Sequence, residues 1–308
     1  MSRPRPAWVP PARDGVSASR VAVTPGPWAT VADFLAARLL PGIDWPARLA
    51  RGEVLDHQGQ ALAPDARCMP GTVLWYWRSL PPEPRIPFEV ELLHHDDYLV
   101  VVDKPHFLPV TPGGRYLQET VLVRLKRQLG IATLVPMHRL DLDTAGVLAF
   151  TVTPATRHAY QAVLRDRQAH KVYEAVAPWR ADLALPTIIS SRLLEAAGEG
   201  FMQMQTVPGE PNAHTQLTSI RRLGDLAHYQ LTPLTGRKHQ LRAQMAALGL
   251  PIVGDRLYPR LLPQPPDGTA PDYSQPLQLL ARELAFTDPI DGRPRRFVSR
   301  RTLALAAG

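Results

Sequence analysis

The segment from His138 to Gly146 brings two carboxyls, a guanidinium and an imidazole together in the order His-Arg-Leu-Asp-Leu-Asp-Thr-Ala-Gly. The apolar run from Val147 to Phe150 follows at once and predicts a buried strand. A carboxylate at the edge of a core costs free energy unless a cation pairs with it or a reaction needs it. The later segment from Thr235 to Arg242 is rich in cations and offers such a partner. The residues therefore indicate a carboxylate that has either a cationic partner or a reactive role.

Two other interpretations of this segment fail on the residues themselves. A calcium loop that began at Asp141 would have Ala145 at its fifth position and Val152 at its twelfth, where a bidentate Glu is required. A kinase catalytic loop needs Asp directly after His-Arg, and Leu140 stands there instead. A structural alternative stays open, in which Asp141 only caps a turn and pairs with a nearby Arg.

The composition favours a soluble protein with an anionic partner. The chain has 308 residues and a formal net charge of +7, and it lacks an apolar run of membrane-spanning length. Nucleic acid is therefore expected before a membrane, with no DNA partner expected. Cys68 is the only cysteine, which excludes an intramolecular disulfide and a thiolate metal cluster. The first eleven residues lack the apolar core of a secretory signal, so we expect a cytoplasmic protein, and we expect it to be a monomer.

Composition shifts along the chain predict its domains. Apolar spacing over residues 30–40 predicts an amphipathic helix, and two short stretches near 52–59 and 70–77 predict strands. The proline-rich stretch that follows predicts a stiff extended linker. We therefore expect a flexible basic N-terminus (1–23), a small module (24–80), the linker (81–87) and a larger domain (88–308).

The larger domain is predicted to be α+β, with a mixed sheet and flanking helices. Strands are expected near 91–93, 98–102, 171–177 and 228–234, helices at 121–128 and after Gly236, and a long loop at 259–276. Lys171, Tyr173 and Ala175 should share one face of their strand. The sequence His-His-Asp-Asp at residues 94–97 could suggest a metal site. A solvated turn is the better interpretation, because adjacent residues rarely converge on one ion.

From about residue 88 to 297, the chain resembles the RluA-type RNA pseudouridine synthases. The family motif His-Arg-Leu-Asp-x-x-Thr-Ser-Gly is matched at 138–146, Lys-x-Tyr-x-Ala at 171–175, and Thr-Gly-Arg-x-His-Gln-Ile/Leu-Arg at 235–242. Shorter family motifs are matched at 102–110, 249–255 and 284–289. Ala145 stands in place of the usual Ser, and Gln244 in place of a common His. Several motifs in family order are hard to attribute to chance.

The resemblance implies that the protein isomerises uridine in RNA to pseudouridine. The N1 glycosidic bond breaks, the retained uracil rotates, and it rejoins the ribose through C5, with no external cofactor. The catalytic residues implied are Asp141, which would attack the ribose or remove a proton from it, Arg237, which would pair with Asp141, and Tyr173, which would stack on the base. A largely antiparallel sheet with flanking helices is the fold implied.

The same resemblance implies the substrate contacts. The target uridine must leave its stack, and Arg139 is the expected residue to fill the gap. His138 is expected to brace its loop. The other substrate-binding residues implied are Lys171, His239 and Arg242, and Lys238 is a further candidate for a phosphate contact.

The small module weakly resembles an S4-like RNA-binding domain. Three arginines, Arg38, Arg48 and Arg51, could follow an RNA backbone, whereas residues 75–77 (Trp-Tyr-Trp) could be core. Ribosomal RNA is the first expected substrate and transfer RNA the second. Two alternatives stay open: a non-catalytic RNA-binding or RNA-remodelling protein with the same fold, and a nucleoside hydrolase that releases uracil.

Overall fold

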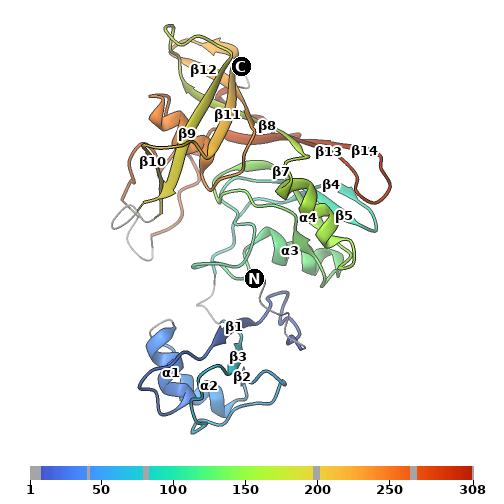
Figure 1. Cartoon of the computed structure of the whole chain (residues 1–308). Helices are drawn as coiled ribbons and strands as arrows, with labels where there is room; N and C mark the ends of the chain where they lie inside the picture. Colours follow the sequence, from blue (N-terminus) through green and yellow to red (C-terminus); the bar gives the residue numbers. More distant parts are fainter. Residues whose placement is uncertain (1–7, 40–41, 79–82, 197–201, 264–268, 307–308) are drawn as a thin grey trace. The chain divides into compact units, whose positions relative to one another are not determined.

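The computed structural model describes residues 8–39, 42–78, 83–196, 202–263 and 269–306. The chain forms two compact units (Figure 1). The smaller unit comprises Met1–Pro84 and Pro112–Ala132, and the larger comprises Arg85–Thr111 and Thr133–Gly308. Segment 112–132 thus joins the smaller unit, although the sequence had placed it in the larger domain. In the described part of the chain, no helix is both long and apolar enough to cross a membrane.

The smaller unit packs three helices and, within the described residues, a three-stranded sheet in the order β1-β3-β2. Its elements are β1 (Ser19–Ala22), α1 (Val31–Arg38), α2 (Trp45–Ala50), β2 (Val54–Leu55), β3 (Val73–Tyr76) and α3 (Val121–Leu129). The predicted helix near 30–40 is α1, which begins with a capping box between Thr30 and Asp33. Residues 1–7 of the expected flexible terminus lie outside the described residues. The strand β1, within the same expected terminus, was not predicted.

One of the arginines proposed for RNA contact in this unit is structural. Arg48 is buried, donates to Glu53 at 2.7 Å and also donates to the carbonyl of Trp77. Arg48 is therefore unavailable to an RNA backbone, and its prediction as a contact is wrong. Trp75 and Trp77 are buried as well, which confirms the interpretation of that stretch as core.

The larger unit contains one mixed sheet with eleven strands among the described residues. Its main order is β10-β9-β11-β12-β8-β13-β7-β5-β4, with β14 paired to β13 and β6 paired to β7. Only the β13–β7 pair is parallel among the pairings of the described strands, so the expected mixed, largely antiparallel sheet is confirmed. The elements are β4 (Glu91–His95), β5 (Leu99–Lys104), β6 (Val135–Pro136), β7 (Ala145–Thr151), α4 (Arg157–Arg165), β8 (His170–Pro178), β9 (Thr187–Glu195), β10 (Met204–Val207), β11 (Ala213–Leu223), β12 (Leu226–Pro233), α5 (Gln240–Ala247), β13 (Leu279–Thr287) and β14 (Pro294–Val298).

Two helices cover different parts of this sheet. Tyr160 and Val163 of α4 pack with apolar side chains of β5, β7 and β13. Leu241 and Met245 of α5 pack instead with β8, β11 and β12. The buried residues of α4 lie on one face, as the apolar spacing predicts, whereas α5 is buried over most of its length. The central strands β8 and β13 thereby connect the two parts of the core (Figure 1).

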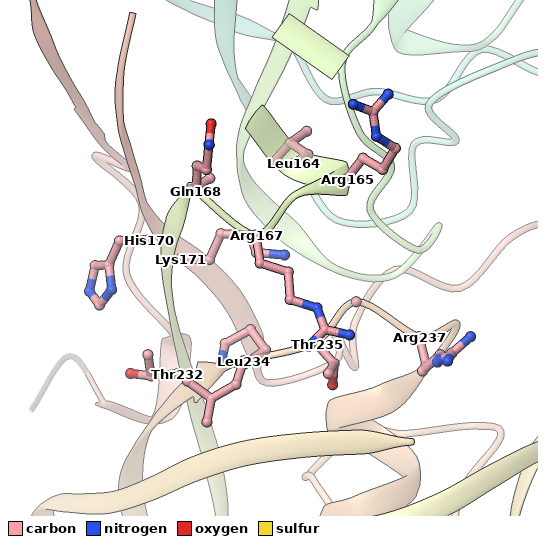
Figure 2. Close-up of a pocket in the computed structure, with 13 residues that line it drawn as sticks. Leu164, Arg165, Arg167, Gln168, His170, Lys171, Thr232, Leu234, Thr235 and Arg237 are labelled. Carbon is pink, nitrogen blue, oxygen red and sulfur yellow. The ribbon is translucent and has the colours of Figure 1, made fainter. Parts of the chain in front are cut away.

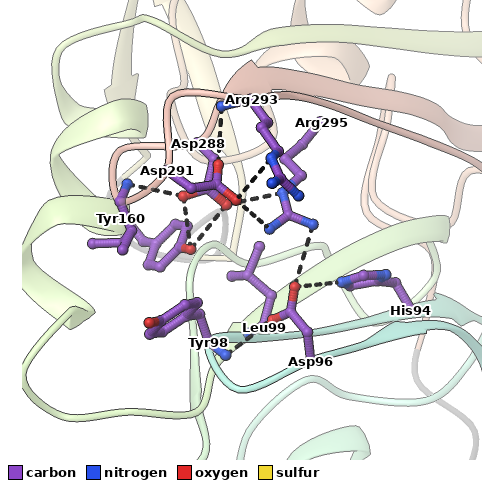
Figure 3. A network of polar contacts seen from close by, with 10 residues as sticks. His94, Asp96, Tyr98, Leu99, Tyr160, Asp288, Asp291, Arg293 and Arg295 are labelled. Carbon is purple, nitrogen blue, oxygen red and sulfur yellow. Dashed lines mark hydrogen bonds and ion pairs between the residues drawn. The ribbon is translucent and has the colours of Figure 1, made fainter.

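A buried polar network holds α4 to the sheet (Figure 3). The hydroxyl of Tyr160 donates to the carboxylate of Asp288, with both oxygens at 3.0 Å, and Asp288 also accepts from Arg295 at 2.9 Å. Arg295 reaches Asp96 at 3.2 Å, and His94 lies 2.8 Å from the same carboxylate. The stretch His-His-Asp-Asp is therefore part of a structural turn. A buried carboxylate needs such partners to stay charged.

A second network ties β8 to β12 and β13. Arg282 forms a bidentate pair with Glu174 at 2.7 and 2.8 Å, and His228 lies 3.1 Å from the same carboxylate. Burial opposes the charge on Glu174, but the hydrogen bonds from His228 and Arg282 outweigh burial and lower the pKa of Glu174 to about 2. Glu174 and Tyr173 alternate along β8, so this pair fixes the strand from the side opposite Tyr173.

Candidate active site

Asp141 lies in the turn that leads into β7. The backbone N–H of Thr144 donates to the carbonyl of Asp141 at 3.2 Å, which closes the turn. Gly146 follows with a φ of 114°, and a Cβ built there would lie 2.2 Å from the carbonyl oxygen of Ala281 on β13. Only glycine fits where two backbones approach this closely. The close pairing of β7 with β13 therefore fixes where the chain delivers Asp141.

The cationic partner of Asp141 is Arg242. Its Nη1 donates to Oδ2 of Asp141 at 3.0 Å, and its Nε and Nη2 donate to the carboxylate of Asp255 at 2.8 and 2.7 Å. The Arg242 side chain is 2% exposed and Asp255 is entirely buried, whereas Asp141 is 27% exposed. Burial opposes the charge on Arg242, but Asp255 and Asp141 together raise its pKa. A guanidinium that bridges two carboxylates holds the outer one in a fixed position.

This arrangement corrects two predictions. Arg237 is exposed, and its Nε donates to the carbonyl of Asn212 at 3.2 Å. Within the described residues, Asp141 pairs with Arg242 and not with Arg237, so the prediction of Arg237 as its partner is wrong. Arg242 was expected to contact phosphate, and its burial excludes that role. The helix α5 begins at Gln240, which turns Arg242 inward and leaves Arg237 in the preceding loop.

His239 borders Asp141 from the same loop. Its Nε2 lies 3.7 Å from Oδ1 of Asp141, and its Nδ1 lies 3.2 Å from the hydroxyl of Tyr258. Burial lowers the pKa of His239, although the charge of Asp141 acts in the opposite direction. The hydroxyl of Tyr258 also accepts from the backbone N–H of Met204 at 2.6 Å. His239 is thus held neutral at neutral pH, beside the oxygen that Arg242 does not bind.

Tyr173 faces the same carboxylate from β8. It is half-buried, and burial together with the negative charge of Asp141 raises the pKa of its hydroxyl. Its ring packs against the core of β8, β12 and α5. The phenol therefore stays protonated, and it offers an uncharged aromatic ring next to the carboxylate.

A buried lysine, Lys104, holds the turn that contains Asp141 through backbone carbonyls. Lys104, at the end of β5, donates through Nζ to the carbonyls of Pro105 and Leu142, each at 2.9 Å. Burial lowers the pKa of Lys104 to about 7, and the nearby Asp143 and Asp141 oppose that shift. The Nδ1 of His106 lies 2.6 Å from the carbonyl of Asp143. The backbone immediately after Asp141 is thus fixed by side chains from residues 104–106.

Of the other predicted site residues, His138 is half-buried, whereas Arg139 and Lys238 are exposed. The Nε2 of His138 accepts from the backbone N–H of Ala149 at 3.3 Å, and burial with the charge of Lys171 lowers the pKa of His138 to about 3. Its geometry therefore fits a neutral brace. Arg139 is exposed and has no hydrogen bond or ion pair with any other described residue. Lys238, also exposed, lies 3.4 Å from Glu195.

The two departures from the family motifs are accommodated by packing. Gln244 is buried, donates to Ser191 at 3.0 Å and to the carbonyl of Ala213 at 3.1 Å, and accepts from Thr215 at 2.6 Å. Every polar atom of this amide therefore has a partner. Ala145 is fully buried among apolar side chains. Neither residue contacts Asp141 directly.

Sequence reasoning missed Asp255, Tyr258 and Lys104. Lys104 and Asp255 lie within matched motifs, but no role was assigned to them, and Tyr258 lies in no motif. The role of each residue depends on contacts between distant segments, which the sequence does not show. A signal did exist for Asp255, which follows the buried Ile252 and a glycine, so its carboxyl had to lie at the edge of a core. In the described part of the chain, no group of three or more His, Cys, Asp or Glu side chains is arranged to hold a metal ion.

The chain is similar to known proteins in sequence and in fold. Residues 98–247 match the family described as RNA pseudouridylate synthase. An uncharacterized RNA pseudouridine synthase of Synechocystis is 32% identical, over 70% of this chain and 73% of its own length. The dual-specificity RNA pseudouridine synthase RluA of Haemophilus influenzae is 31% identical, over 68% of this chain and 91% of its own length. The structure of human RNA pseudouridylate synthase domain-containing 1 has a TM-score of 0.55 at 24% identity, with 71% of this chain and 86% of that chain covered, and supports the fold.

The mixed sheet and the family match together define an enzyme that isomerises uridine in RNA. The chain belongs to the RluA-type RNA pseudouridine synthases.

Proposed function

We propose that Asp141 carries the chemistry of uridine isomerisation. The observation that carries this proposal is a carboxylate with one oxygen bound by a buried guanidinium, Arg242, while the side chain remains 27% exposed. A fixed and accessible carboxylate can attack the ribose, or remove a proton from it, as the N1 glycosidic bond breaks. Arg242 acts as a positioning residue, and Asp255 holds Arg242.

Tyr173 is proposed to stack on the uracil. Its neutral ring lies beside Asp141 and packs on the core behind it, so a base placed against the ring would be shielded from water on that side. A detached uracil held in this way can rotate and present C5 to the ribose. The ring would thereby keep the free base from escaping between the cleavage of the N1 bond and the formation of the C5 bond.

The uridine is proposed to flip out of its RNA stack to reach Asp141, which costs roughly a few kcal/mol. Arg139 is the proposed substitute in the stack, since it is exposed, precedes Asp141 by two residues, and has no partner in the described part of the chain. A guanidinium plane stacks well on bases. The flip therefore uses a residue on the same turn as the catalytic carboxylate.

Ribosomal RNA is the first proposed substrate and transfer RNA the second. Support comes from the net charge of +7 and from the small helical module, which we propose is S4-like and contributes Arg38 and Arg51 to RNA binding. Both arginines are exposed, and Arg51 pairs with Glu53 at 2.6 Å. We also propose that the protein acts as a cytoplasmic monomer and does not act on DNA.

A pseudouridine map of total RNA from cells with and without the protein tests the substrate. The expected result is the loss of one or a few sites, restored by the wild-type protein and not by Asp141→Asn. The purified enzyme should convert the same RNA without release of uracil. Free uracil in the mixture would instead identify a hydrolase, and an unchanged map would reject ribosomal and transfer RNA as substrates.

A further inference from the structure

A cavity of about 580 Å³ opens between two segments next to the candidate active site (Figure 2). One wall is the end of α4, the turn after it and the start of β8, and the other is the end of β12 with the loop before α5. Lys171 lies in the first wall, and Thr235 and Arg237 lie in the second. None of the residues that line the cavity is acidic.

The charges in the cavity are positive and mostly unneutralised. Arg165 forms a bidentate pair with the neighbouring Asp166 at 2.8 and 2.9 Å, so its charge is balanced. Arg167, Lys171 and Arg237 have no carboxylate partner among the described residues. Three such cations around one cavity repel each other unless an anion joins them. The site therefore has the composition of an anion-binding site.

Arg167 holds an unfavourable backbone conformation at this site. It follows α4 in the left-handed region, with a φ of 58°, where helices usually place glycine. Its backbone N–H donates to the carbonyl of Leu164 at 3.3 Å, as expected where a helix ends. Figure 2 shows its side chain extending from this turn toward Thr235 in the opposite wall. An arginine in a glycine position indicates that the side chain has a use there.

Lys171 connects the cavity to the candidate catalytic residues. It is half-buried, and burial lowers the pKa of its amine because no acid compensates the charge. It precedes Tyr173 by two residues and shares its face of β8, which places their Cα atoms about 7 Å apart. An anion bound at Lys171 would therefore lie within one nucleotide of a base stacked on Tyr173.

We propose that this cavity binds a backbone phosphate of the RNA strand that carries the target uridine, with Arg167, Lys171 and Arg237 as its contacts. The assignment deepens the proposed function and rests on it. A phosphate held there would fix the register of the strand, so that the flipped nucleotide meets Tyr173 and Asp141. It also gives a role to Arg237, which does not pair with Asp141.

The test measures RNA binding in the Asp141→Asn background, where chemistry does not interfere. The probes are a labelled oligouridylate of about 12 nucleotides and the unmodified ribosomal and transfer RNA. The variants are Arg167→Gln, which removes the charge and keeps the side-chain bulk, and Arg167→Gly, which also relieves the left-handed backbone. Arg293→Gln is the matched control, because this arginine is 81% exposed and is not one of the residues that line the cavity.

Both Arg167 variants should bind RNA about tenfold more weakly, and the slope of log affinity against log salt should become less negative by about 0.7 to 1. Arg293→Gln should match the parent in both respects. The thermal midpoint of Arg167→Gly should not fall, because glycine suits this backbone position, and this separates lost binding from misfolding. With Asp141 intact, the KM for RNA should rise in the Arg167 variants while kcat stays within about twofold.

Equal affinities and salt slopes for the parent and both Arg167 variants would overturn the assignment. A second arm replaces chloride with inorganic phosphate at constant ionic strength. If phosphate raises the thermal midpoint of the parent but not of Arg167→Gln, and the two bind RNA equally, the site takes a free phosphate and the RNA assignment is overturned. Failure of this assignment can be distinguished from failure of the proposed catalytic role of Asp141, because the Asp141→Asn variant is used to measure RNA binding without catalysis.

Discussion

The substitution Arg242→Lys tests the contacts that hold Asp141 in place. Arg242 donates two hydrogen bonds to Asp255 and one to Asp141, at 2.8, 2.7 and 3.0 Å. Lysine keeps the charge, but its single nitrogen cannot reproduce the bidentate pair with Asp255 together with the separate hydrogen bond to Asp141. At least one charge-assisted hydrogen bond in a buried setting is lost, and each contributes about 1.5–3 kcal/mol. We therefore expect the free energy of unfolding to fall by about 2–4 kcal/mol.

The same change should release Asp141 from its fixed position. A misplacement of about 1 Å costs on the order of 100-fold in rate, so single-turnover pseudouridine formation should fall by about that factor. The rate is measured with saturating enzyme at a temperature where the variant remains folded, and the unfolding free energy is measured by urea titration.

Arg180→Lys is the matched control for this experiment. Arg180 also makes a bidentate pair, with Asp182 at 3.0 and 2.6 Å, but the two side chains are 38% and 71% exposed. Solvent screens an exposed pair, so the control should lose far less stability than Arg242→Lys and should keep its rate. If Arg242→Lys behaved like this control, the bridge between Asp255 and Asp141 would not be what positions the catalytic carboxylate.

Three further predictions concern the framework around the site. Tyr160→Phe should lower the unfolding free energy in urea by about 1–2 kcal/mol, since Asp288 keeps its other donors, and no loss would mean that the network in Figure 3 does not anchor α4. The pKa of Glu174 falls from its ordinary 4.5 to about 2 on folding, so its contribution is full above about pH 4.5 and is lost as the pH falls towards 2. Glu174→Gln should therefore cost about 1–2 kcal/mol at pH 7, after allowance for solvent screening, and should weaken the acid dependence of stability in that window, whereas an unchanged pH profile would contradict this. Gly146→Ala should lower the free energy of unfolding by more than about 3 kcal/mol, because the added Cβ meets the backbone of β13. Gly224→Ala, which has open space around it, should lower it by only about 1 kcal/mol, and similar losses in the two variants would refute the steric reason.

Local patterns in the sequence predicted the elements that carry the site. The alternation at Lys171 and Tyr173 predicted β8, and the glycine and apolar spacing after Gly236 predicted a helix that is now α5. These signals depend on neighbours in the chain and on a regular period, which is why they could be read without a structure. The strands β9 to β11 were missed, because much of their surface faces solvent and their pattern has little contrast.

The choice between two arginines could not be made from the sequence. Arg237 and Arg242 lie in the same motif, and either could reach Asp141 along an extended loop. The first turn of α5 makes Arg242 the partner of Asp141, because it directs Arg242 into the core and towards Asp255. The start of this helix could not be fixed from the sequence, because element boundaries are the least predictable part of a fold.

The most direct test of the central claim compares Asp141→Asn with Asp143→Asn. Both remove one carboxylate from the same turn, but only Asp141 is held by Arg242. We predict that Asp141→Asn forms no detectable pseudouridine while it binds RNA within about threefold of wild type, and that Asp143→Asn loses less than about tenfold in rate. Pseudouridine formation by Asp141→Asn at the wild-type rate would contradict the account.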